Sequence, residues 1–161
     1  MIKIQGKRGL YPGSFNPWHV GHWDVLVKAL QIFEEVHICQ MYNPTKGVAK
    51  VLPFSALTHD ELGNKYEGRE ELLKRVAITA HGGLLVDIAS ANYDAIIRGL
   101  RNGSDLQYEQ NMQYWNEDLG LKIPVIYFVT DRKLSHISSS ALRELDRFKG
   151  LAARGYSDGT S

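Results

Sequence analysis

Short, largely apolar segments alternate with amphipathic ones along most of this chain. Five segments have the length and composition of buried strands, namely residues 8–11, 36–41, 76–80, 95–97 and 125–129. Between them lie stretches with apolar side chains at helical spacing, such as residues 20–33 and 104–119. Strands that are apolar throughout need cover on both faces, and strands that alternate with helices form parallel sheets. The sequence therefore predicts an α/β fold: a single Rossmann-like domain with a five-stranded parallel sheet and helices on both faces.

Further helices are expected over residues 70–75, 84–91 and 141–148. The rest of the polar region 58–75 contains two glycines, which predicts a loop or a broken helix there. Ser104 is followed by Gln107 in a capping-box pattern, so the helix over 104–119 is expected to begin at Ser104.

Nineteen Lys and Arg residues against eighteen Asp and Glu residues give the 161-residue chain a formal net charge of +1. Proteins that coat nucleic acid or bind membrane surfaces usually carry a clear basic excess, so we expect neither partner. Cys39 is the single cysteine, which excludes an internal disulfide and is typical of a reducing compartment. We see no apolar targeting segment, and the longest uncharged stretch, 9–23, is interrupted by two prolines. We therefore expect a cytoplasmic protein.

Polar clusters follow four of the predicted strands. They cover residues 12–22, 43–46, 98–101 and 136–140. Ligands of open parallel sheets bind beyond the carboxyl ends of the strands, so the four clusters are expected to meet in one site.

The residue types in these clusters indicate phosphate binding. Lys46, Arg98 and Arg101 supply positive charge, and the two arginines can bind an anion with two parallel hydrogen bonds. Residues 138–140 are three serines before a predicted helix, where free backbone N–H groups favour an anion. Gly13 and Gly21 are expected to let the backbone approach the ligand closely.

Motifs of other phosphate enzymes are missing from the sequence. It contains no G-x-x-x-x-G-K-[ST] loop, which excludes a Walker-type nucleotide site. We find no nucleophile and base at a spacing typical of covalent catalysis. The clusters therefore predict a site that positions and neutralises phosphates.

Simpler roles remain open for the same residues. His19 and His22 could begin a metal site, although no acidic or cysteine ligand is nearby, or His22 could be a helix cap or a packed ring. The serines at 138–140 could be only a helix cap. Arg98 could pair with an acidic residue, and so could Arg101; the candidate partners are Asp94, Asp105 and Glu109. The aromatic residues Trp18, Trp23, Tyr108, Tyr114 and Trp115 are expected in the core or on helix faces.

Two motifs resemble those of a known family. Residues 11–22, Tyr-Pro-Gly-Ser-Phe-Asn-Pro followed by Gly-His, resemble the signature of the nucleotidyltransferase superfamily that carries an HxGH motif. Residues 98–109, which read Arg-Gly-Leu-Arg-Asn-Gly-Ser-Asp-Leu-Gln-Tyr-Glu, are similar to the narrower pattern of the bacterial phosphopantetheine adenylyltransferases. Residues 83–87 and 137–140 match that pattern as well.

The resemblance implies a reaction. The family transfers AMP from ATP, bound with Mg²⁺, to 4′-phosphopantetheine, and forms dephospho-CoA and pyrophosphate in coenzyme A biosynthesis. The attack is direct and in line, without an enzyme nucleophile. Residues 1–150 would be the nucleotidyltransferase domain, and residues 151–161, which have few apolar side chains, are expected to be a disordered tail.

The resemblance also assigns roles to residues. His22 would stabilise charge on the α-phosphate, Ser14 would touch both substrates, and Lys46 would hold the acceptor phosphate, so these three are the catalytic candidates. The acceptor would be bound by Ser14, Lys46, Leu85 and Arg98. ATP would be bound by Ser14, Phe15, His22, Gly99, Leu100, Arg101, Glu109, Leu134, Ser135, His136, Ile137, Ser138, Ser139 and Ser140.

Departures from the family pattern keep other functions open. Asn16 replaces the usual Asp, and His19-Val20 replaces the usual Thr-Asn; both features are also common in NMN adenylyltransferases. The alternatives are therefore an NMN adenylyltransferase or another nucleotidyltransferase, and, less favoured, a nucleotide-binding module without catalysis. Residues 47–75 match the family poorly. The family's last helix continues beyond the position of Phe148, so a homo-oligomer is possible here but the usual hexamer is in doubt.

Overall fold

The computed structural model describes residues 4–47, 51–59, 62, 64–131, 145 and 147. Within them, five strands form one parallel sheet in the order β3-β2-β1-β4-β5. The strands are β1 (Ile4–Gly13), β2 (Phe33–Met41), β3 (Val76–His81), β4 (Ala95–Leu100) and β5 (Val125–Val129). The helices are α1 (Val20–Leu30), η1 (Pro44–Lys46), α2 (Ser55–Thr58), α3 (Glu70–Leu73), α4 (Val86–Asn92) and α5 (Gly103–Asp118). The predicted α/β class and five-stranded parallel sheet are confirmed.

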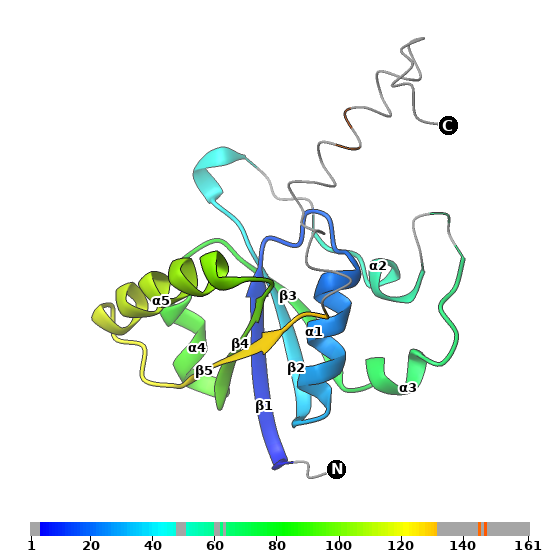
Figure 1. Cartoon of the computed structure of the whole chain (residues 1–161), viewed down its shortest axis with the longest axis horizontal. Coiled ribbons are helices and arrows are strands. Elements are labelled where there is room, and N and C mark those ends of the chain that lie inside the picture. Colours follow the sequence, from blue (N-terminus) through cyan, green and yellow to red (C-terminus); the bar gives the residue numbers. More distant parts are fainter. Residues whose placement is uncertain are drawn as a thin grey trace.

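Two layers of helices cover the sheet (Figure 1). On one face α1 packs its apolar stripe, which includes Val25 and Leu26, against strand residues such as Tyr11 and Ile38. On the other face Ala89 of α4 joins a smaller cluster with Leu10 and Cys39. Neighbouring residues Leu10 and Tyr11 thus belong to opposite faces, as the alternation of side chains along a strand requires. No helix in the described ranges is long and apolar enough to cross a membrane.

Several element ends differ from the sequence prediction. The helix predicted over 20–33 ends at Leu30, and Phe33 begins β2 instead, where its ring is buried. The strand expected over 95–97 continues to Leu100, so Arg98 lies inside β4 rather than after it. Asn102, not Ser104, caps α5, because its side chain accepts a hydrogen bond from the Asp105 N–H. Of the helix expected over 141–148, only Leu145 and Arg147 are described, and both are helical.

The aromatic side chains are divided between the core and the surface. Trp18 and Trp23 pack against the core on the α1 face. Tyr108, Tyr114 and Trp115 are exposed on α5. The prediction of core and helix-face aromatics is therefore confirmed.

The strand order determines where a ligand can bind. From β1 the chain passes to β2 and β3 on one side, then crosses to β4 and β5 on the other. The direction of winding therefore reverses between β1 and β4. In such sheets the loops at the carboxyl ends of these two strands diverge and leave a crevice, which is the usual ligand site.

Candidate active site

The turn after β1 carries the first group of predicted site residues. Ser14 is exposed, whereas Phe15 is 3% exposed and has a positive φ of 47°. The Phe15 ring meets the rings of Tyr11 and His22 edge-on, with centroids 5.1 and 4.9 Å away. This packing anchors the turn in the core and leaves Ser14 exposed just beyond the carboxyl end of β1.

Two histidines cap the start of α1. The N–H of Gly21 donates to Nδ1 of His19, and the N–H of His19 donates to Nδ1 of His22, each over 3.1 Å. The two rings stack with centroids 3.6 Å apart. The pair therefore forms a reciprocal capping box, in which each histidine satisfies a backbone N–H that has no partner within the helix. The simpler interpretation of His22, as a cap and packed ring, describes what the structure shows, and it is compatible with a catalytic role.

The caps fix the protonation of His22. Its Nδ1 accepts a hydrogen bond, so the neutral ring carries its proton on Nε2. Burial, with smaller contributions from the charges of His19, Arg98 and Arg101, lowers the pKa of His22 well below its ordinary value. Burial and the nearby Arg101 lower the pKa of His19 to about 4. At neutral pH, His22 is therefore an uncharged hydrogen-bond donor.

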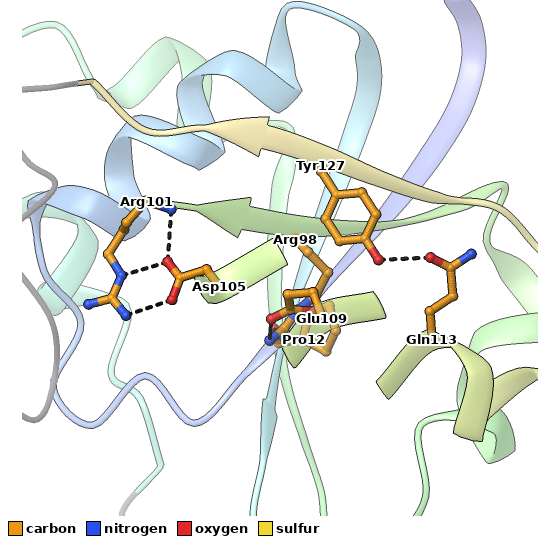
Figure 2. Close-up of polar contacts among 7 residues, drawn as sticks. All are labelled: Pro12, Arg98, Arg101, Asp105, Glu109, Gln113 and Tyr127. Carbon is orange, nitrogen blue, oxygen red and sulfur yellow. Dashed lines mark hydrogen bonds and ion pairs between the residues drawn. The ribbon is translucent and has the colours of Figure 1, made fainter. Parts of the chain in front are cut away.

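Arg98 is held in the sheet by two partners (Figure 2). Its Nε and one terminal nitrogen donate to the carboxylate of Glu109 over 2.9 and 2.6 Å, and its other terminal nitrogen donates to the carbonyl of Pro12 over 2.7 Å. Burial opposes its charge, but the hydrogen bonds and charge of Glu109 raise the pKa of Arg98 above its ordinary value. Arg98 therefore connects β4, α5 and the end of β1.

Arg101 has its own carboxylate partner, as Figure 2 shows. Its Nε and a terminal nitrogen donate to Asp105 over 2.9 and 3.0 Å, and its backbone N–H donates to the same carboxylate over 2.8 Å. Both arginines thus make the ion pairs that the simpler interpretation suggested. A guanidinium has five N–H donors. Three of them are used in Arg98 and two in Arg101 by these bonds, so donors remain for an anion.

The glycines of the predicted site pack against protein groups. A Cβ on Gly99 would lie 2.7 Å from a methyl carbon of Val25, so this glycine lets β4 approach α1. The Phe15 ring occupies the space beside Gly13, and the His19 ring occupies the space beside Gly21. At both glycines an added Cβ would collide with these rings, so each glycine lets a ring of the chain itself pack closely. That Gly13 and Gly21 also let a ligand approach the backbone stays a prediction.

The remaining predicted site residues lie at different places around His22, Arg98 and Arg101. Leu100 is buried at the end of β4, and Leu85 is half-buried before α4, where it packs on the smaller core cluster. Lys46 is exposed at the end of η1, and no hydrogen bond or ion pair described here links it to the arginines. The cluster 136–140 and the expected ATP contacts Leu134, Ser135, His136, Ile137, Ser138, Ser139 and Ser140 lie outside the described residues.

One residue of the site was not found from the sequence. Gln40 of β2 is 5% exposed, and its side chain contacts both Ser14 and Leu52. The signal available was an amide at two-residue spacing from the apolar Val36 and Ile38, on the same face of the strand. The described residues contain no group of three His, Cys, Asp or Glu side chains that could hold a metal ion. The carboxylates of Asp105 and Glu109, moreover, already serve the two arginines.

The winding of the parallel sheet reverses between β1 and β4, and a neutral histidine and two oriented guanidinium groups lie near the carboxyl ends of these strands. This combination is typical of the class of α/β domains that bind phosphates. Comparison with known proteins is specific. Residues 10–145 match the model of the cytidylyltransferase-like family. The phosphopantetheine adenylyltransferase of Streptococcus pneumoniae (strain 70585) is 35% identical over 150 residues, which are 90% of this chain and 86% of that protein. The phosphopantetheine adenylyltransferase of Streptococcus pyogenes serotype M5 (strain Manfredo) is 33% identical over 145 residues, or 89% and 85% of the two chains.

The chain therefore belongs to the cytidylyltransferase-like nucleotidyltransferases and, among them, to the family of the phosphopantetheine adenylyltransferases. The recognition made from residues 11–22 and 98–109 is confirmed. A solved structure, the lipopolysaccharide core biosynthesis protein of Thermoplasma volcanium GSS1, is similar at a TM-score of 0.48 and 16% identity, over 78% of this chain and 98% of that one. Similarity at that level says nothing about substrate.

Proposed function

We propose that this chain transfers the adenylyl group of ATP to the phosphate of 4′-phosphopantetheine. An oxygen of the acceptor phosphate attacks the α-phosphorus of ATP, and the bond from that phosphorus to the oxygen bridging to the β-phosphate breaks. Pyrophosphate leaves with the bonding electrons, and dephospho-CoA is formed. The observation that carries the proposal is the neutral His22 near the charges of Arg98 and Arg101: His22 can donate a hydrogen bond to a phosphate oxygen, and the two guanidinium groups can neutralise charge that develops there, without a covalent bond to the enzyme.

Each protein group has a defined task in this reaction. His22 donates from Nε2 to an oxygen of the α-phosphate, and its capping bond prevents the ring from turning. Arg98 holds the acceptor phosphate with the donors that Glu109 and Pro12 leave unused, together with Lys46. Arg101 faces the ATP phosphates, and Ser14 lies between the two substrates. Preorganised donors of this kind need no rearrangement when the transition state forms.

Mg²⁺ belongs with ATP in this proposal. The carboxylates of Asp105 and Glu109 are paired with arginines and are therefore not available as metal ligands. The site thus fits an ion that is bound mainly by the phosphates of ATP. When bound, the ion would neutralise charge on the β- and γ-phosphates. The proposed substrates are those of a cytoplasmic pathway, in keeping with the buried free thiol of Cys39.

The test is pyrophosphate release from Mg-ATP by the full-length chain, with 4′-phosphopantetheine and nicotinamide mononucleotide compared as acceptors. We expect release with 4′-phosphopantetheine only. Release with nicotinamide mononucleotide alone would support the other acceptor. Tight ATP binding without release in either reaction would indicate a module without catalysis.

A further inference from the structure

Gln40 is a polar residue at a buried position of the sheet. It lies on the same face of β2 as Val36 and Ile38, both of which are fully buried in the core. An amide that is removed from water without hydrogen-bond partners destabilises the folded chain. An apolar side chain at this position would avoid that destabilisation. The role of Gln40 must therefore come from the hydrogen bonds that its amide makes.

Both ends of the amide bind backbone of other segments. Nε2 donates to the carbonyl of Ser14 over 3.2 Å, and Oε1 accepts from the N–H of Leu52 over 2.6 Å. Gln40 also pairs in register with Gly13, the last residue of β1. Ser14 is therefore the first residue beyond the pairing of β1 with β2. There the side-chain amide of Gln40, instead of a backbone N–H of β2, donates to the β1 chain.

The two segments joined in this way lie next to residues that the proposed function assigns to substrate binding. Ser14 precedes Phe15, whose left-handed backbone makes the turn sharp. Leu52 follows the connection that carries Lys46, and its side chain is 6% exposed in the core. One buried amide thus links the residue expected between both substrates to the end of the connection expected to hold the acceptor phosphate.

We propose that Gln40 is a positioning residue for adenylyl transfer: its side-chain amide fixes the backbone of Ser14 relative to Leu52, and so sets the distance between the two substrate-binding segments. This inference rests on the proposed function. Loss of the bridge would let the Ser14 turn shift, and a displacement of about 1 Å in a positioned group can cost up to roughly a hundredfold in rate.

Two substitutions of Gln40 separate its contacts. Q40M keeps the length of the side chain and removes both hydrogen bonds. Q40E keeps the acceptor for Leu52, but its ionised form cannot donate to Ser14. Burial raises the pKa of a carboxylic acid, so the buried acid is expected to take up its proton as the pH falls through the mildly acidic range, and the protonated form can make both bonds again.

I38V is the matched control. Ile38 is on the same strand and the same face, two residues earlier, and its side chain is completely buried. This substitution removes one buried methylene from the same core cluster and leaves both hydrogen bonds of Gln40 in place. Thermal midpoints, kcat and the KM for each substrate are measured for the wild type, Q40M, Q40E and I38V, at a temperature where all four are folded.

We expect kcat/KM of Q40M to fall about tenfold or more, with a raised KM for 4′-phosphopantetheine, while I38V keeps both constants near those of the wild type. The activity of Q40E relative to the wild type should rise as the pH is lowered, whereas the ratio for Q40M stays flat. Wild-type constants in Q40M, or a flat ratio in Q40E, would overturn the inference and leave the proposed function intact. A wild-type chain that releases no pyrophosphate would contradict the proposed function, and this inference with it.

Discussion

At the scale of single residues, His22 combines a structural and a chemical task. Its Nδ1 accepts the backbone bond that caps α1, and its Nε2 is left as the donor. We expect H22A to remain folded and to lose about 10²–10³ in kcat, since one preorganised donor is removed. H22N separates the two tasks, because its side-chain oxygen can still accept near the cap while the Nε2 donor is absent.

Pyrophosphate release and thermal unfolding of both His22 variants test this prediction. A matched control is H37Q. His37 lies on the face of the sheet opposite to α1, where its ring contacts Tyr93. Ordinary turnover in H22A would contradict the assigned role.

The hydrogen bonds of Arg98 require the planar shape of its guanidinium group as well as its charge. A lysine at this position keeps the charge but cannot make two parallel bonds to Glu109 and a third to Pro12. For R98K we expect a loss of about 1–3 kcal/mol in the free energy of unfolding and a rise of about tenfold in the KM for 4′-phosphopantetheine. Urea unfolding and steady-state kinetics measure the two effects.

Arg8 offers the comparison for this substitution. It makes a single, largely exposed bond to Glu35 near the start of β1. R8K should therefore change the free energy of unfolding by less than about 0.5 kcal/mol. Equal effects of R8K and R98K would show that the geometry of the Arg98 fork does not matter.

At the scale of elements, α5 is attached to the sheet mainly by polar side chains. Glu109 is its buried residue, and its other described links are the bonds from Arg98 and Arg101 and the hydrogen bond from Tyr127 to Gln113 (Figure 2). Because Asp105 holds Arg101 and donates its N–H to Asn102, the cap of α5 and the orientation of Arg101 depend on each other.

The α5 cap gives a prediction at this scale. N102A should lower the free energy of unfolding by about 1 kcal/mol, because the Asp105 N–H loses its partner, and should raise the KM for ATP. S104A removes an exposed hydroxyl in the first turn of the same helix and should be close to neutral. Thermal unfolding and the ATP dependence of pyrophosphate release distinguish the two, and a larger effect of S104A would contradict the observed cap.

The elements were predictable where local pattern decides them. Apolar runs identified all five strands, and the range of β5 was correct because Pro124 comes directly before it and the polar Thr130 directly after it. Phe33 was assigned to a helix because its spacing from Leu30 is helical, whereas its pairing with Ile4 of β1 places it at the start of β2. That pairing joins residues far apart in the sequence, so no local pattern reveals it. The bridge from Gln40 joins residues 26 and 12 positions away, so no local pattern could reveal it.

At the scale of the whole molecule, the capping histidines affect how stability depends on pH. His19 has a pKa of about 4 in the folded chain and an ordinary value of 6.5 when unfolded. Between these values the unfolded chain binds more protons at His19, so the contribution of His19 to the free energy of unfolding falls as the pH is lowered from 6.5 towards 4 and is fully present above 6.5. H19N should reduce this dependence, because asparagine can cap the helix but does not titrate.

We expect the fall in melting temperature between about pH 7 and about pH 5 to be smaller in H19N than in the wild type. Part of the His19 ring faces solvent, which weakens the effect of its pKa shift on stability. We therefore expect the two proteins to differ by about 1 kcal/mol in the loss of stability over this pH range, or by about 2–4 °C in melting temperature for a chain of this size. Carboxylates titrate mostly below this range, so the comparison reports on the histidine pair. The charge of His19 is one cause of the lowered pKa of His22, so the change in slope includes the loss of that coupling. Equal slopes in the two proteins would mean that His19 is not held neutral by the fold, and the uncharged capping box beside the arginines would then have to be abandoned.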